Sequence, residues 1–109
     1  MTNTTRRFNF SGTVWRYDGP AAWHFVTLGA GPSERIRKFI RGASAPWGSV
    51  RVQAEIRGVT WETSIFPDRK LGSYLLPLKQ QIRKRLALYE DCNVRGSVKV
   101  VREADLLDL

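Results

Sequence analysis

The fold is decided by residues 49–66, which read SVRVQAEIRGVTWETSIF. Before Arg57-Gly58 the apolar residues alternate with polar ones, the period of two expected of a half-buried strand, and they are Val50, Val52, Ala54 and Ile56. If Arg57-Gly58 is a two-residue turn, their partners across the hairpin are Ile65, Thr63, Trp61 and Val59. A register shifted by one residue would put the two apolar sets on opposite faces, so the sequence predicts this pairing.

Two strands and a helix are expected before this hairpin. Residues 8–17 form a first strand with one face made of Phe8, Phe10, Gly12 and Val14. The turn residues Asp18-Gly19-Pro20 separate it from a second strand over residues 22–28, which is rich in aromatic and β-branched residues. A helix is expected over residues 33–42, with Ser33 as its N-cap, Gly42 at its C-terminus, and an apolar stripe of Ile36, Phe39 and Ile40.

After the hairpin we expect a loop over residues 66–72, a strand over 73–78 and a helix over 79–88. Pro77 lacks an N–H and therefore belongs at an edge or at the end of the strand. The helix directs one seam toward the core, formed by Leu78, Ile82, Leu86 and Tyr89. A last strand over residues 94–101 has one face made of Val94, Gly96, Val98 and Val100. This order of short strands favours a mainly β fold, a small barrel with two short helices at its ends.

The chain has 109 residues and 42% hydrophobic residues, which fits one domain over residues 1–109 with flexible ends at 1–6 and 103–109. A single cysteine, Cys92, excludes an intramolecular disulfide. The start of the chain has no apolar segment typical of a signal peptide, and no apolar run is long enough to cross a bilayer. We therefore expect a cytoplasmic protein with no membrane partner.

The formal net charge is +8, and it has two interpretations. An excess of this size attracts nucleic acid, anionic lipid or acidic ligands. It is also an ordinary means of keeping a small domain soluble.

Residues suited to catalysis are few. His24 is the only histidine, and it lies in an aromatic strand with no nearby acid in the sequence to orient it. Cys92 follows Glu90 and Asp91, which disfavour a thiolate. The metal-binding spacings HExxH and CxxC do not occur, and neither does a glycine-rich phosphate loop. The sequence predicts a non-enzymatic protein without cofactor or metal.

The basic helix over residues 79–88 also has two interpretations. Its cations spread around the helix, as on an amphipathic helix whose charged side faces water. Lys79 and Arg83, however, are neighbours at spacing i, i+4 and can hold one anion, with hydroxyl donors from Thr63 and Ser64 if the helix packs near the hairpin.

The chain closely resembles the bacterial family known as domain of unknown function 1905. The family motifs F-x-G, W-x-F-V, V-x-V-x-x-x-I-x-G, T-S-[LI]-F-P, Y-L-L-P-[LV]-K and I-R-K correspond in order to residues 10–12, 23–26, 50–58, 63–67, 74–79 and 82–84. Two positions differ, because Glu90-Asp91 replaces the usual Gly-Asp and Leu28-Gly29 replaces Leu-Pro. The resemblance implies a small closed six-stranded barrel of the double-split type, and it implies no activity.

Three functions follow as hypotheses. The first is a binding module, a monomer or weak dimer, that engages an anionic partner. The second is a sequence-independent nucleic-acid binder that uses both helices through Arg35, Arg37, Lys38, Arg41, Lys79, Arg83, Lys84 and Arg85. The third is a small-ligand site at the barrel mouth lined by Trp23, Trp61 and Tyr74, although such aromatic residues more often belong to the core.

Overall fold

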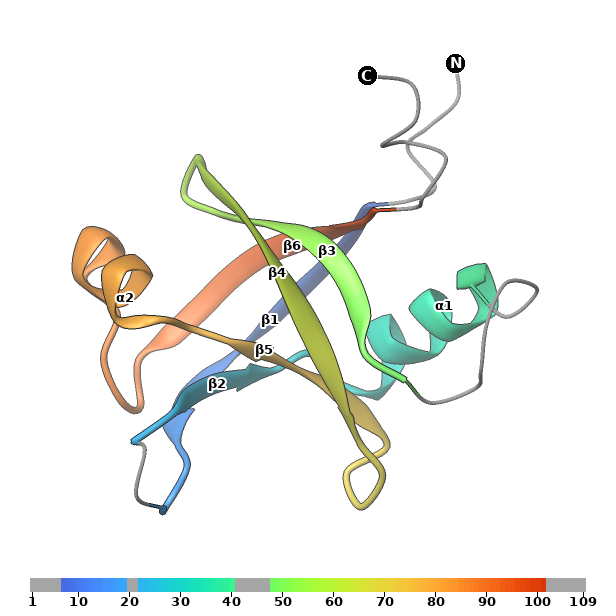
Figure 1. The fold of residues 1–109 in the computed structure, drawn as a ribbon, viewed down its shortest axis with the longest axis horizontal. Coiled ribbons are helices and arrows are strands. Elements are labelled where there is room, and N and C mark those ends of the chain that lie inside the picture. The colour runs from blue at the N-terminus through green and yellow to red at the C-terminus, as the bar shows by residue number, and fades with distance from the viewer. Residues whose placement is uncertain (1–6, 20–21, 41–47, 102–109) are drawn as a thin grey trace.

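Six strands form a closed antiparallel barrel in the order β1-β2-β5-β4-β3-β6, in which β6 pairs with β1 (Figure 1). The structure is a computed structural model, and it describes residues 7–19, 22–40 and 48–101. The elements are β1 (Arg7–Arg16), β2 (His24–Thr27), α1 (Ala30–Ile40), β3 (Val50–Ile56), β4 (Val59–Asp68), β5 (Ser73–Pro77), α2 (Gln80–Leu86) and β6 (Asn93–Val100). The mainly β barrel with two helices is as the sequence predicted. The ends expected to be flexible, residues 1–6 and 103–109, lie outside the described residues.

The β3–β4 hairpin has the predicted register. Its inward pairs are Val50–Ile65, Val52–Thr63, Ala54–Trp61 and Ile56–Val59. Arg57 and Gly58 form the turn with φ angles of 51° and 81°, the left-handed conformation that a tight two-residue hairpin turn requires. The alternation of apolar and polar residues therefore determined both the pairing and the inward face.

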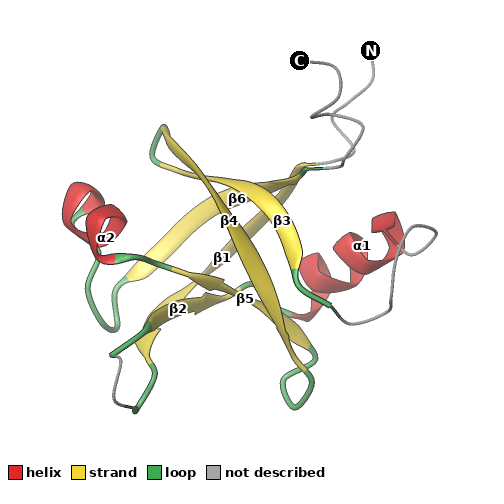
Figure 2. Cartoon of the chain, in the orientation of Figure 1, coloured by secondary structure: helices red, strands yellow, loops and turns green. Residues whose placement is uncertain are grey.

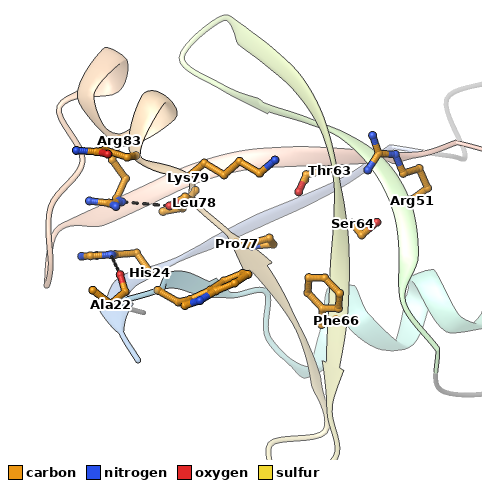
Figure 3. A pocket seen from close by; sticks show the side chains of 12 residues that line it. Ala22, His24, Arg51, Thr63, Ser64, Phe66, Pro77, Leu78, Lys79 and Arg83 are labelled. Carbon is orange, nitrogen blue, oxygen red and sulfur yellow. Dashed lines mark hydrogen bonds between the residues drawn. The ribbon is translucent and has the colours of Figure 1, made fainter. Parts of the chain in front are cut away.

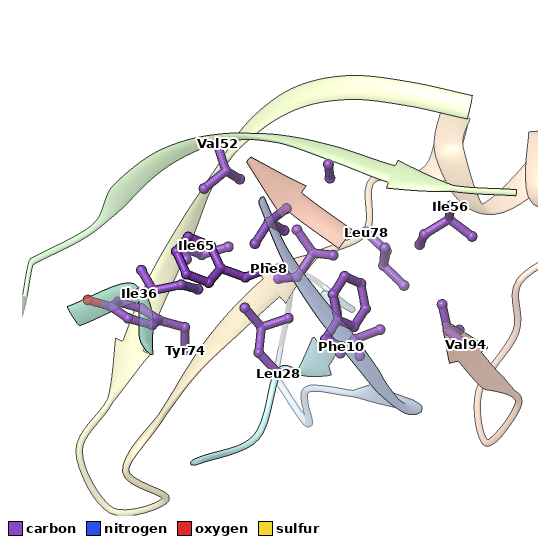
Figure 4. Packing of buried hydrophobic residues seen from close by; sticks show 14 of the residues in the cluster. Phe8, Phe10, Leu28, Ile36, Val52, Ile56, Ile65, Tyr74, Leu78 and Val94 are labelled. Atoms are coloured by element: carbon purple, nitrogen blue, oxygen red, sulfur yellow. The ribbon is translucent and has the colours of Figure 1, made fainter. Parts of the chain in front are cut away.

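The interior of the barrel is filled by alternate side chains from every strand, together with residues that follow β2 and β5 (Figure 4). The predicted inward faces of β1 and β6 are confirmed, since Phe8, Phe10, Val14, Val94, Val98 and Val100 are all buried. The second strand is shorter than predicted, since β2 includes only His24–Thr27.

Helices α1 and α2 lie on opposite sides of the barrel (Figures 1 and 2). Helix α1 contacts β1 and β5, with Ile36 fully buried and the Phe39 ring 5.8 Å from the ring of Phe8. The expected N-cap was wrong, because the helix begins three residues earlier and Ser33 is buried inside it. Ser33 instead accepts a hydrogen bond from the Tyr74 backbone N–H at 2.8 Å. The expected C-terminal residue Gly42 lies outside the described residues.

Helix α2 is shorter than predicted. It ends at Leu86 because Ala87 adopts a left-handed conformation, with a φ of 55°. The chain leaves the helical path there, so the expected seam is wrong at its end: Tyr89 is 67% exposed and Leu88 is buried in its place. A guanidinium nitrogen of Arg57 donates to the Leu86 carbonyl at 2.9 Å, which ties the end of the helix to the β3–β4 turn.

The segment after Ile65 also differs from the prediction. Residues Phe66–Asp68 were expected in a loop, but they continue β4 and pair with β5. Pro67 has no backbone N–H to donate. It is tolerated there because a residue in a strand directs its N–H toward only one of the two neighbouring strands, so the pairing on the other side is unaffected. Pro77 ends β5, as expected.

Candidate anion-binding pocket

A pocket of about 390 Å³ opens where strands β4 and β5 separate. The two strands pair only over Phe66–Asp68 and Ser73–Leu75; beyond these residues β4 continues beside β3, and β5 continues beside β2. The gap between them is bounded by the start of α2 (Figure 3). Because barrel topology creates this gap, residues that are far apart in the sequence line it together.

The four residues predicted to bind an anion all line this pocket: Thr63, Ser64, Lys79 and Arg83. Lys79 is not within the helix as expected but is the residue before it, in an extended conformation. The Arg83 backbone N–H nevertheless donates to the Lys79 carbonyl at 3.0 Å, so the two residues remain one helical turn apart. Figure 3 shows the Lys79 side chain extending across the pocket toward Thr63.

The two hydroxyl residues reach the pocket from different faces of β4. Thr63 belongs to the inward face and is only 5% exposed, so it reaches the pocket through the gap beside β5. Ser64 belongs to the outward face, directly opposite Arg51 of β3. Within the described part of the chain, neither side chain makes a hydrogen bond, so both hydroxyls are available to a ligand.

Three cationic side chains line the pocket. Lys79 forms no ion pair with any described residue, and Arg83 only donates from Nε to the Leu78 carbonyl at 3.1 Å. Arg51 lies 3.7 Å from Glu62, but both side chains are about half exposed, so this pair is weak. Among the described residues that line the pocket there is no aspartate or glutamate. The side chains that line the pocket therefore carry an excess of positive charge, and Glu62, which is outside the pocket, opposes it only weakly at Arg51.

Arg51 and His24 are pocket residues that the sequence did not identify. The hairpin register already placed Arg51 beside Ser64, which was the available signal. His24 lies beside the pocket with Nδ1 3.0 Å from the Ala22 carbonyl. Because a carbonyl only accepts, Nδ1 carries the proton of this bond and Nε2 remains available. No sequence signal linked His24 to α2, since their proximity depends on the β2–β5 pairing.

The structure does not bring together Trp23, Trp61 and Tyr74, the proposed small-ligand site. Trp23 is 49% exposed at the pocket, Tyr74 is fully buried in the core, and Trp61 is partly buried against the core. Burial raises the pKa of Tyr74, an effect that the positive charge of Arg37 partly opposes. Of the three residues, Trp23 lines the pocket described above, whereas Trp61 and Tyr74 do not line it.

The helical cations do not form the single basic face that the second hypothesis requires. The two helices lie on opposite sides of the barrel (Figure 1). Lys38 of α1 is 3.7 Å from Glu34 on its own helix, and Arg41 lies outside the described residues. Positive charge therefore gathers locally, and the pocket beside α2 combines it with unpaired hydroxyls.

The described residues contain neither a metal-binding cluster nor a membrane-spanning helix. They contain no group of three or more histidine, cysteine, aspartate or glutamate side chains placed to hold a metal ion. None of the helices in residues 7–19, 22–40 and 48–101 is long and apolar enough to cross a membrane.

Comparison with known proteins gives a family and no curated relative. No curated protein matches the chain at a significant level. Residues 10–100 match the family described as Domain of unknown function (DUF1905). This range includes every strand except the first residues of β1, as well as all residues of the pocket. Because the match covers most of the chain, the protein belongs to the DUF1905 family.

Proposed function

We propose that this protein is a non-enzymatic binding module that holds an anionic ligand in the pocket between β4 and α2. The observation that carries this proposal is the meeting of Lys79, Arg83 and Arg51 with two unpaired hydroxyls in one hollow. A volume of about 390 Å³ lies in the range of small-molecule sites.

The chemistry of these side chains suits phosphate or carboxylate oxygens. Ammonium and guanidinium groups form short hydrogen bonds to anionic oxygens, and a hydroxyl adds a neutral donor. Binding is favoured over catalysis because, among the described residues, neither Thr63 nor Ser64 is hydrogen-bonded to a histidine or carboxylate that would activate it. The pocket therefore supplies recognition groups without an activated nucleophile.

Replacing both Lys79 and Arg83 with glutamine is expected to weaken binding of inorganic polyphosphate about tenfold or more, because each charged hydrogen bond contributes about 1.5–3 kcal/mol. Isothermal titration calorimetry at low salt measures the change. The matched control replaces Lys84 and Arg85, which are exposed on the same helix and outside the pocket. Both double variants remove two positive charges, so net charge is held equal.

Two comparisons make this test decisive. Arg83 contacts the Leu78 carbonyl, so Lys79→Gln alone, which breaks no intramolecular hydrogen bond, is measured beside the double variant. Thermal unfolding shows that the variants remain folded. If the control pair weakens polyphosphate binding as much as the pocket pair, affinity depends on overall charge and the pocket is not the site.

A further inference from the structure

A second hollow adjoins the cationic pocket on the outer surface of the barrel. It has a volume of about 330 Å³ and is lined by Tyr17, Trp23, Phe25, Phe66 and Leu75. Trp23 and Phe66 line both hollows, so the two form one continuous surface. One half of this surface is cationic and the other half is aromatic. We refer to the residues of the second hollow as the aromatic platform.

The platform follows from strand register. Phe25 of β2 pairs with Trp15 of β1 on one side and with Pro77 of β5 on the other. Leu75 of β5 pairs with Phe66 of β4. Residues directly opposite each other in neighbouring strands share a face. On this face Phe25 and Leu75 are half-buried and Phe66 is exposed, whereas the residues beside them that point inward, Val26, Leu76 and Ile65, are buried. The apolar residues therefore cover the outer surface of the barrel, where they contribute nothing to its interior.

The rings are held in place before any ligand arrives. The Trp23 ring stacks on Phe25 at 5.9 Å with an interplanar angle of 16°, and Phe25 packs on Trp15 at 5.2 Å. The Trp15 indole N–H donates to the Thr27 hydroxyl at 2.9 Å, which fixes the base of this stack. The Tyr17 N–H donates to the Trp23 carbonyl at 2.7 Å. A ligand that stacks on Trp23 would therefore meet an ordered ring at little cost in entropy.

Exposed apolar side chains concentrate at this surface. Five large hydrophobic residues of the described chain are exposed, and three of them belong to the platform: Tyr17 at 52%, Trp23 at 49% and Phe66 at 41%. Single exposed apolar residues are normal on a protein surface, whereas a contiguous patch marks an interaction site. The cations at its edge require a partner that combines flat apolar groups with negative charge.

We propose that this joint surface binds single-stranded nucleic acid, an inference that rests on the proposed anion-binding function. Bases stack on Trp23 and Phe66, and the neighbouring phosphates lie at Lys79, Arg83 and Arg51. A single strand alternates flat rings with phosphates, the same two groups that the two hollows accommodate. In a duplex the base faces are hidden by stacking on one another, so a duplex cannot use the platform. Both hollows are open to solvent, which suits a chain better than an enclosed metabolite.

The test compares two oligomers that differ only in their bases. One is an oligodeoxythymidylate of about eight nucleotides, within the range bound by small single-strand modules, and the other is an abasic oligomer of equal length. We expect the wild-type protein to bind the oligodeoxythymidylate about 5- to 100-fold more tightly, because stacking adds to the phosphate contacts. Fluorescence anisotropy of labelled oligomers at low salt measures both affinities.

Replacing Trp23 with alanine is expected to remove most of this preference, because it weakens binding of the oligodeoxythymidylate far more than binding of the abasic oligomer. Trp23→Phe keeps a ring and is expected to restore part of the preference. The matched control is Tyr89→Ala, which deletes another exposed aromatic side chain outside both hollows and should preserve the preference. Thermal unfolding confirms that each variant is folded.

The outcomes separate the two proposals. Equal affinity for both oligomers, still dependent on Lys79, overturns nucleic-acid binding and leaves the anion pocket intact. Tighter binding of a polyglutamate peptide than of oligodeoxythymidylate likewise overturns nucleic acid as the occupant and assigns the pocket to acidic peptides. If replacing Lys79 and Arg83 leaves the affinities for both oligomers and for polyphosphate unchanged, both proposals fail.

Discussion

Replacing Gly96 with alanine is expected to destabilise the folded protein by about 3 kcal/mol, the upper end of the cost of overpacking a well-filled interior. A Cβ atom at this position would lie 2.5 Å from the Glu55 carbonyl oxygen and 2.8 Å from the Ile56 side chain. The first of these neighbours is backbone, which moves only if the β3–β6 pairing shifts. Gly96 needs no special backbone angle, so the effect is purely steric. Urea-induced unfolding measures it directly.

The control is Gly48→Ala. Gly48 has no positive φ, and a Cβ there would meet no atom within 4 Å. Removing the flexibility of glycine from the unfolded chain stabilises a protein by about 0.4–1 kcal/mol where the native conformation permits it. The two substitutions should therefore have opposite signs. A Gly96→Ala variant as stable as Gly48→Ala would contradict the close approach of β3 to β6 at this position.

Replacing both Ser33 and Ser73 with alanine is the second large change, with an expected loss of about 2–5 kcal/mol in the free energy of unfolding. Both serines are buried, and their hydroxyls lie 3.3 Å apart. Ser33 accepts from the Tyr74 N–H at 2.8 Å, and Ser73 accepts from the Gly29 N–H at 2.9 Å. Each alanine leaves a backbone N–H without this partner, and a buried, unsatisfied donor costs about 1–3 kcal/mol.

A double-mutant cycle shows whether the two serines act together. Because the hydroxyls are adjacent and serve the same junction of α1 with β5, the two single losses should not add. The control is Ser64→Ala, which removes a hydroxyl that forms no hydrogen bond in the described chain and should change stability by less than about 0.5 kcal/mol. Chemical unfolding of all four variants provides the energies. Losses for Ser33→Ala and Ser73→Ala as small as that control would contradict the buried network.

The sequence predicted well where neighbouring residues determine the structure. The hairpin register was correct because alternation and the Arg57-Gly58 turn leave one pairing that puts the apolar residues of both strands on the same face. The same alternation placed Gly96 on an inward face. It could not show why glycine stands there, since the limiting contact is with Glu55, whose strand meets β6 only in the folded barrel.

Errors arose where tertiary contacts override local preference. Serine is a residue type preferred at the N-cap, but a hydrogen bond to a distant strand fixes Ser33 inside α1. Tyr89 continued the helical stripe, yet Ala87 ends the helix and directs the chain away, so Leu88 is buried in its place. In both cases the deciding contact or backbone turn had no signature in the neighbouring sequence.

In the candidate site, too, local sequence determined some features and tertiary contacts determined the others. The sequence by itself determined the strand faces, the central hairpin and the pairing of Lys79 with Arg83 across one helical turn. Only the tertiary structure placed Arg51, Thr63 and Trp23 around that pair, because β4 and β5 part after three paired residues and open the barrel surface beside α2. The reason is physical: periodicity records which side of a strand a residue faces, whereas the meeting of distant strands depends on how the whole barrel closes.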